Sequence, residues 1–152
     1  MTAHSDHPCI PQELETGVAI IDEEHRRLRE FIGRLRSICA DFACKQDCTG
    51  CSAERIGACD AAFLDCMTEL LGFMLDHFRH EEQLMKDLGI SARQHERYQL
   101  HAEDHANIAG RLAGLTRPQP RAATVREIAD TASHITRWLD NHIADHDLPM
   151  LH

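Results

Sequence analysis

The chain has 152 residues, 43% hydrophobic and 27% charged, which fits one globular domain with a buried core. Its formal net charge is -9, from 16 basic and 25 acidic residues, and no basic patch stands out. Nucleic acid and anionic membrane surfaces are therefore not expected as partners. No apolar run approaches 18 residues and the first residues lack a signal-peptide pattern, so we expect a cytoplasmic protein without a membrane span.

The first half of the chain predicts an arm and two helices. Residues 1–16 are polar and interrupted by prolines, which predicts an irregular N-terminal arm, with a single bundle domain over residues 17–152. From Ala19, apolar side chains alternate at spacings of three and four, as on a helix packed in a bundle, and this helix is expected to end near Ala43. A second stripe runs through residues 63–88, and Gly89 follows it where a C-cap glycine belongs.

The second half predicts two further helices. Ser91 with Gln94 predicts a capping box before a third helix, whose stripe runs through residues 98–115. Thr124 with Glu127 predicts another capping box, which opens the fourth helix. Four helices with short connections predict an all-α protein, an up-down-up-down antiparallel four-helix bundle.

Polar residues interrupt these stripes at positions that should face the core. A lone core histidine is usually a hydrogen-bonded structural residue. A set of polar residues on all four stripes needs a shared explanation, because burying a glutamate without a partner costs free energy of folding. Within the second and third helices the residues are four apart, so each pair lies on one helix face. In an antiparallel bundle the whole set falls at one end, where a bound cation would explain it. The set is His25, His77, Glu81, His101, His105 and His142.

Taken in order, these features resemble the hemerythrin-like family, and in particular its single-domain bacterial members. The match covers nearly the whole chain from Gly17 onward, and its pieces are specific when they occur together. They are Gly17-Val18-Ala19-Ile20-Ile21-Asp22-Glu23-Glu24-His25, His77-Phe78-Arg79-His80-Glu81-Glu82, His101 with His105, and Trp138-Leu139-Asp140-Asn141-His142-Ile143 followed by Asp147.

The resemblance implies a non-haem centre of two iron ions bridged by an oxo or hydroxo group. One iron would be held by His101, His105 and His142, the other by His25 and His77, and both would be bridged by Glu81 and Asp147. The iron with two histidines would keep an open position for dioxygen, beside a pocket lined by Leu139. Such a protein would be an oxygen carrier, store or sensor, and a sensor would need a separate signalling or electron-transfer partner.

The surroundings of this set give further expectations. Asp147 lies five residues after His142 and just before Pro149, where we expect the last helix to fray. Other polar residues near the set are predicted to be solvated surface residues. They are Glu24, His80, Glu82, His95, His134 and His146.

The seven cysteines depart from the family pattern. Four of them, Cys44, Cys48, Cys51 and Cys59, fall in the connection 44–59 between the first two helices, at the end of the bundle away from the histidines. Closely spaced thiols can bind zinc, hold an iron–sulfur cluster or form a reversible disulfide, although this spacing matches no common motif well. Reduced thiols that only pack between helices are an equally weighted alternative.

Two other functions remain open at this point. One is a di-iron redox enzyme or scavenger that acts on peroxide or nitric oxide. The other is a redox or metal sensor based on the cysteines. A glutamate or tyrosine that reaches the open iron would favour an enzyme, and the sequence places none there clearly, so we expect a protein without enzymatic activity.

Overall fold

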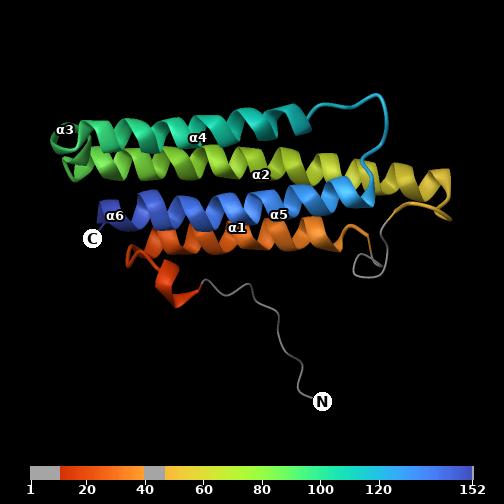
Figure 1. Ribbon diagram of the computed structural model, residues 1–152, viewed down its shortest axis with the longest axis horizontal. Helices are drawn as coiled ribbons and strands as arrows, with labels where there is room; N and C mark the ends of the chain where they lie inside the picture. Colours follow the sequence, from red (N-terminus) through yellow and green to blue (C-terminus); the bar gives the residue numbers. More distant parts are fainter. Residues whose placement is uncertain (1–10, 40–46, 152) are drawn as a thin grey trace, which may run out of the picture.

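The computed structural model describes residues 11–39 and 47–151, and the regular structure within these ranges is helical (Figure 1). Four long helices run antiparallel to their neighbours in sequence, so the predicted up-down-up-down bundle is confirmed. Short turns of helix flank them. The long helices are α1 (Ala19–Ser37), α2 (Ala53–Asp87), α4 (His95–Leu115) and α5 (Val125–His142), and the short ones are η1 (Gln12–Leu14), α3 (Ile90–Arg93), η2 (Ile143–Asp147) and α6 (Leu148–Leu151).

Helix α1 begins where the sequence predicts it but ends earlier. The Asp22 carboxylate accepts hydrogen bonds from the backbone N–H of Thr16, at 2.8 Å, and of Gly17, at 3.1 Å, which fixes the entry of the chain. The helix ends at Ser37, so the prediction that it runs to about Ala43 is wrong. Cys39 lies beyond the end of the helix but is still buried in the core. The apolar pattern therefore continues past the helix, which is why the pattern alone predicts a longer helix.

Helix α2 begins within the stretch predicted as a loop. The Ser52 hydroxyl accepts the backbone N–H of Arg55 at 3.1 Å and caps the helix, so Cys59 lies on α2 rather than in the connection. At the other end Gly89 has a φ of 74°, which confirms the predicted C-cap glycine. The stripe ends differently than predicted, because Leu88 is 47% exposed and Met85 is buried.

The entry into α4 differs from the sequence prediction, whereas the entry into α5 agrees with it. Ser91 lies inside the short helix α3, and Gln94 precedes α4 without any side-chain cap, so the predicted capping box is wrong. Gly89, in the left-handed conformation, is the residue directly before α3, so the chain is already helical at Ser91 and the predicted cap does not form there. The capping box of Thr124 and Glu127 is confirmed, with both hydrogen bonds at 3.1 Å.

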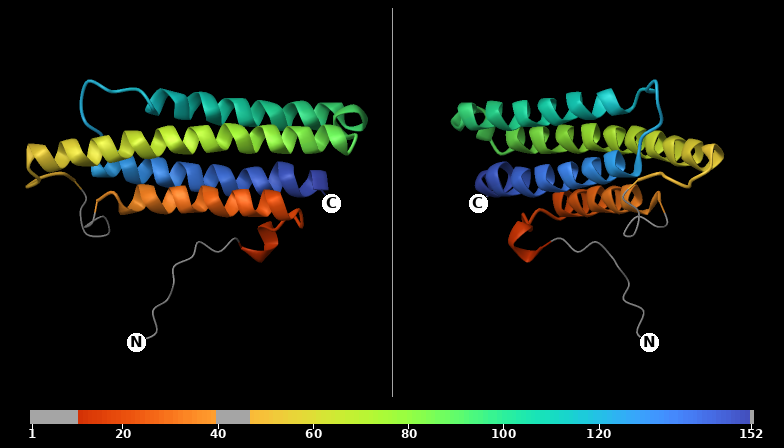
Figure 2. Two further views of the ribbon diagram at one scale, coloured as in Figure 1. Left: turned by 180° about the vertical axis from the view of Figure 1, so that it is seen from behind. Right: turned by 45° about the vertical axis from the view of Figure 1, so that its right-hand side comes forward.

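The apolar core fills most of the length of the bundle, with α1 beside α2 and α5, and α2 beside α4 (Figure 2). Buried polar side chains replace it at the end where α2 turns into α4, while α2 begins at the far end. None of the described helices combines the length and the apolar character needed to cross a bilayer. The buried core includes Leu28, Ile32, Leu35, Met67, Leu70, Met74, Ile108, Leu112, Ile128, Ile135 and Leu139.

Candidate metal centre

Five imidazoles and two carboxylates meet inside the bundle, at the end near the carboxyl terminus. All four long helices and the turn η2 contribute, and each side chain belongs to a residue that is at most 2% exposed. The structure therefore brings together every residue that the resemblance assigned to the metal. These are His25 from α1, His77 and Glu81 from α2, His101 and His105 from α4, His142 from α5 and Asp147 from η2.

The two oxygens of Glu81 face two different groups of histidines. Oε1 lies 3.2 Å from Nε2 of His25 and 2.7 Å from Nε2 of His77. Oε2 lies near the Nε2 atoms of the other three, at 3.1 Å for His101, 3.0 Å for His105 and 3.4 Å for His142. The carboxylate thus lies between a two-histidine group and a three-histidine group.

The two oxygens of Asp147 are divided between the same two groups of histidines. Its Oδ2 lies 3.1 Å from Nε2 of His25, whereas its Oδ1 lies 2.9 Å from Nε2 of His101 and 3.2 Å from Nε2 of His142. Both carboxylates are therefore placed to bridge the same two groups of nitrogen atoms.

The position of Asp147 depends on a local change of helix type. In an α-helix, residues five apart point about 140° away from each other, so Asp147 and His142 would not share a face. The chain instead forms the π-helical turn η2, in which the N–H of Leu148 bonds to the carbonyl of Ile143, five residues earlier. The described chain stays helical through Leu151, and Asp147 is fully buried.

The donor atoms are spaced as the ligands of metal ions would be, and some of them lack hydrogen-bond partners. Both ring nitrogens of His77 and both carboxylate oxygens of Asp147 are buried without a hydrogen-bond partner of good geometry. Ligands about 2.1 Å from a metal and at right angles to each other lie about 3 Å apart, which is the spacing seen here. A mixed set of imidazoles and carboxylates suits first-row transition metals such as iron. The cluster can therefore hold metal.

The carboxylates are held ionised despite their burial. Burial alone would raise the pKa of Glu81, but the charge of His77 and hydrogen bonds from the three-histidine group hold this pKa well below its usual range. Burial and the charge of Glu81 would raise the pKa of Asp147, but close contacts with the ring nitrogens of His101, His142 and His25 outweigh them and lower it.

The histidines respond in the opposite sense. Burial favours the neutral ring of His77, but the charge of Glu81 outweighs this and raises the pKa to about 9. Burial is likewise outweighed at His25 and His101 by contacts to the two buried carboxylates, and at His142 first by the hydrogen bond to Asp104, so these pKa values are raised. His105 is the exception, because burial lowers its pKa. Without metal, protons thus balance the buried negative charge. A cation bound at the same place would take over this role.

Two further carboxylates lie on the outer side of the ligand rings. Asp104 Oδ2 is 2.6 Å from Nδ1 of His142, and Glu82 Oε1 is 3.2 Å from Nδ1 of His105. Each ring thereby directs its Nδ1 toward a carboxylate and its Nε2 toward the cluster. This arrangement is how metal-binding histidines are oriented in proteins.

Glu24 occupies a similar outer position beside α2. Its Oε1 lies 3.5 Å from Nδ1 of His77, and its Oε2 lies 2.8 Å from Nδ1 of His80. Glu24 is buried and Glu82 is partly buried, so the prediction that both are solvated is wrong. His80 is half exposed but holds Glu24 in place.

The sequence contains a signal for these outer carboxylates in addition to the apolar periodicity. Glu24 precedes His25, Glu82 follows Glu81 and Asp104 precedes His105, so each stands next to a core-facing residue. Neighbours on a helix point about 100° apart, which directs such a side chain toward the adjacent helix. An acidic residue beside a ligand position is therefore a candidate partner for a ligand on the next helix.

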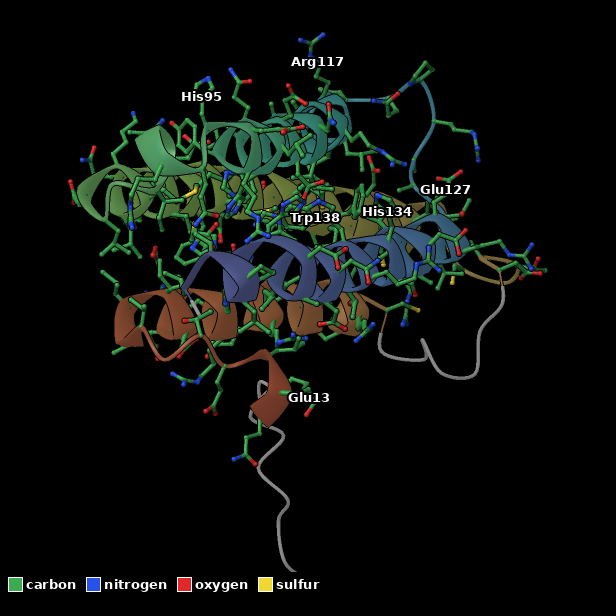
Figure 3. The ribbon with its side chains drawn as sticks, turned by 60° about the vertical axis from the view of Figure 1, so that its left-hand side comes forward. Glu13, His95, Arg117, Glu127, His134 and Trp138 are labelled. Atoms are coloured by element: carbon green, nitrogen blue, oxygen red, sulfur yellow. The ribbon has the colours of Figure 1, made fainter. Side chains whose placement is uncertain are left out.

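Apolar and aromatic side chains close the cluster on its inner side. Phe78 stacks on His105 with ring centres 4.0 Å apart, and Trp138 stacks on His142 at 4.6 Å. Figure 3 shows Trp138 between the helices, whereas His95 projects outward, as predicted for a surface residue. Leu139 is 1% exposed and packs in the same core.

Comparisons with known proteins agree with this site. The sequence model of the family described as "Hemerythrin HHE cation binding domain" matches residues 16–151. The chain belongs to the hemerythrin family. The resemblance seen in the sequence is thus confirmed, and membership implies non-haem iron, which the buried histidines and carboxylates can hold.

Curated relatives carry a consistent name. Proteins named "Bacteriohemerythrin" from Pseudomonas aeruginosa strains LESB58 and UCBPP-PA14 are 26% identical over 142 residues, which cover 93% of this chain and 77% of theirs. A protein of the same name from Pseudomonas paraeruginosa matches to the same extent. No solved structure gave a significant match.

Proposed function

We propose that this protein binds dioxygen reversibly at a centre of two iron ions. The observation that carries the proposal is the division of the carboxylate oxygens, since Glu81 and Asp147 each turn one oxygen to a two-histidine group and the other to a three-histidine group. A single ion would not need donors arranged in two groups. The proposed ligands are His25, His77, Glu81, His101, His105, His142 and Asp147.

The two groups offer different numbers of donors. The three-histidine group supplies three nitrogens, and the group of His25 and His77 supplies two, while Glu81 and Asp147 serve both. The second group therefore leaves more coordination positions for an external ligand. Two iron ions bound here would together supply the two electrons that reversible dioxygen binding requires.

The surrounding side chains support reversible binding rather than oxidation of a substrate. Phe78 and Leu139 exclude water from the inner side of the cluster, which slows the loss of electrons from iron. Asp104 and Glu82 keep the outer nitrogens of their histidines protonated, so that each Nε2 is free to bind metal. The ligand set is also rich in imidazole and poor in carboxylate.

An optical experiment tests the proposal. The protein is loaded with ferrous iron without air, its iron is counted, and its spectrum is followed as dioxygen is added and then removed. We expect two irons per chain and near-ultraviolet and visible bands that appear with dioxygen and disappear on its removal. Immediate and irreversible conversion to the ferric form would overturn reversible binding and favour a redox enzyme or scavenger.

A further inference from the structure

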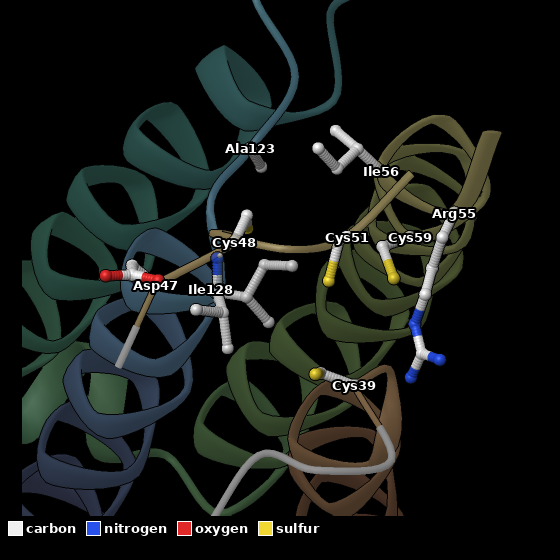
Figure 4. A pocket seen from close by; sticks show the side chains of 10 residues that line it. Cys39, Asp47, Cys48, Cys51, Arg55, Ile56, Cys59, Ala123 and Ile128 are labelled. Atoms are coloured by element: carbon white, nitrogen blue, oxygen red, sulfur yellow. Dashed lines mark hydrogen bonds between the residues drawn. The ribbon is translucent and has the colours of Figure 1, made fainter. Parts of the chain in front are cut away.

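Four cysteines surround a small cavity at the end of the bundle opposite the histidines (Figure 4). The cavity holds about 20 Å³, and Ile56 and Ile128 also line it. Figure 4 shows the sulfur atoms of the labelled cysteines around this common space. They come from different elements: Cys39 follows α1, Cys48 and Cys51 precede α2, and Cys59 lies on α2.

A tight turn sets the spacing of the first pair. The N–H of Cys51 donates to the carbonyl of Cys48 at 3.1 Å, and Gly50 has a φ of 85°, a conformation that favours glycine. The Asp47 carboxylate accepts the N–H of Thr49 at 2.9 Å and braces the turn. Two cysteines separated by two residues at such a turn are half of a common zinc-binding motif.

The second pair joins the ends of two helices. Cys59 Sγ lies 3.9 Å from the carbonyl oxygen of Ile38, the residue before Cys39. Cys39 is buried and Cys59 is partly buried. Cys39 therefore joins Cys48, Cys51 and Cys59 of the group predicted from the sequence, whereas the predicted Cys44 lies outside the described residues.

The chemistry of the cavity selects one class of ligand. Donor groups made only of sulfur favour soft cations, namely zinc, cuprous copper or iron in iron–sulfur clusters. A cavity of about 20 Å³ has room for one ion. All the cysteines of the group are present as thiols rather than disulfides.

Positive groups around the cavity favour bound thiolates. The N–H of Val125, in the first turn of α5, donates to Cys48 Sγ at 3.4 Å. This N–H carries part of the positive end of the helix dipole, which stabilises negative charge on sulfur. Arg55 also lines the same cavity. Four thiolates on a divalent cation leave a net charge of about −2, which the positive end of the helix dipole partly offsets.

We propose that Cys39, Cys48, Cys51 and Cys59 form a second metal site that binds one zinc ion. In a tetrahedral site with Zn–S bonds of about 2.3 Å, the sulfurs lie about 3.8 Å apart. No three of these described sulfurs lie within 4.8 Å of one another, so binding draws them inward. The turn around Gly50 lies outside the helices and can make this movement. The ion would join α1, α2 and the start of α5.

Cobalt provides a direct test on the full, iron-loaded chain. Cobalt(II) is titrated into the reduced protein, followed by zinc. We expect one cobalt per chain with intense visible bands of tetrahedral cobalt and a near-ultraviolet sulfur-to-cobalt band, all abolished by one equivalent of zinc. Cobalt bands without the sulfur band would overturn the proposal, because they would place the ion elsewhere.

Cysteine variants locate the ion. The double variant Cys48→Ser/Cys51→Ser should lose the cobalt–sulfur band and the zinc but keep its iron. The matched control is Cys66→Ser, because Cys66 is buried on α2 beside the carbonyl of Phe31, at 3.8 Å, and does not line the cavity. Unchanged bands in the double variant would overturn the proposal. Iron is counted separately, so this result is independent of the di-iron proposal.

Discussion

Asp104 Oδ2 lies 2.6 Å from Nδ1 of His142, while Nε2 of the same ring faces the buried carboxylates of Glu81 and Asp147. One histidine thus connects a carboxylate at the edge of the bundle to the centre of the cluster. Burial would raise the pKa of Asp104, but the hydrogen bond from His142 outweighs it and lowers this pKa, so Asp104 stays ionised. An ionised acceptor at Nδ1 fixes the ring tautomer that leaves Nε2 free for metal.

The first prediction concerns this contact. Asp104→Asn should weaken iron binding by roughly 10- to 100-fold, because the amide orients and polarises the His142 ring less well. Competition with an iron chelator measures the change. The control is Glu103→Gln, which removes one charge from the neighbouring exposed residue and should leave affinity unchanged. Equal affinity in the Asp104 variant would show that the contact does not position His142 for metal.

The second prediction concerns the proposed bridge. Glu81→Gln keeps the shape of the side chain but removes the charge that faces both histidine groups, so we expect iron to fall from two per chain to one or none. Elemental analysis of the purified protein measures this. Glu69→Gln, an exposed change on the same helix, is the control and should keep both irons. Two irons in the Glu81 variant would rule out a bridging role.

Much of the fold could be predicted because its determinants are local. Apolar periodicity indicated four helices, and the capping box of Thr124 and Glu127 needs only residues three apart. The ends of α1 and α2 were missed because they depend on tertiary packing, as the buried but non-helical Cys39 shows. Periodicity also could not reveal the left-handed start of α3 at Gly89.

The part of the candidate site that the sequence predicts consists of ligand pairs spaced four residues apart on one helix. His77 and Glu81 share one helix face for this reason. Asp147 depends on the π-helical turn, which no α-helical spacing predicts, and only the resemblance pointed to it. The partners of Glu24 lie on another helix, and its place beside His25 is the one sign of them in the sequence, so periodicity alone predicts a solvated residue.

The third prediction concerns the pH dependence of the metal-free protein. The pKa of His77 is raised from 6.5 to about 9, so its contribution to folding is complete below pH 6.5 and is lost as pH rises through 9. The free energy of unfolding should therefore fall over this range, by up to about 3 kcal/mol from this residue. Urea unfolding at a series of pH values measures it.

The metal-loaded protein is the control for this prediction. Metal binds the neutral imidazole, so protons compete with the metal at low pH. The free energy of unfolding of the metal-loaded protein should therefore rise from pH 6.5 to 9. A metal-free protein whose stability is flat or increases from pH 6.5 to 9 would contradict the electrostatic account of the cluster.

The fourth prediction separates packing from protection of the iron. Leu139→Ala should cost about 2–5 kcal/mol of stability, because it leaves a cavity in a close-packed core. It should also accelerate irreversible oxidation after exposure to dioxygen, since Leu139 lies one helical turn before His142 and shields the cluster from water. Denaturant unfolding measures the first effect, and decay of the oxygen-dependent bands measures the second.

Ile135→Ala is the matched control for this change. Ile135 lies on the same helix, one turn further from His142, and is equally buried, so its truncation should cost similar stability. It should not alter the oxidation rate, because it does not open a path beside the cluster. Equal oxidation rates in the two variants would mean that Leu139 only fills the core, and the apolar wall would then have to be assigned to Phe78 and Trp138.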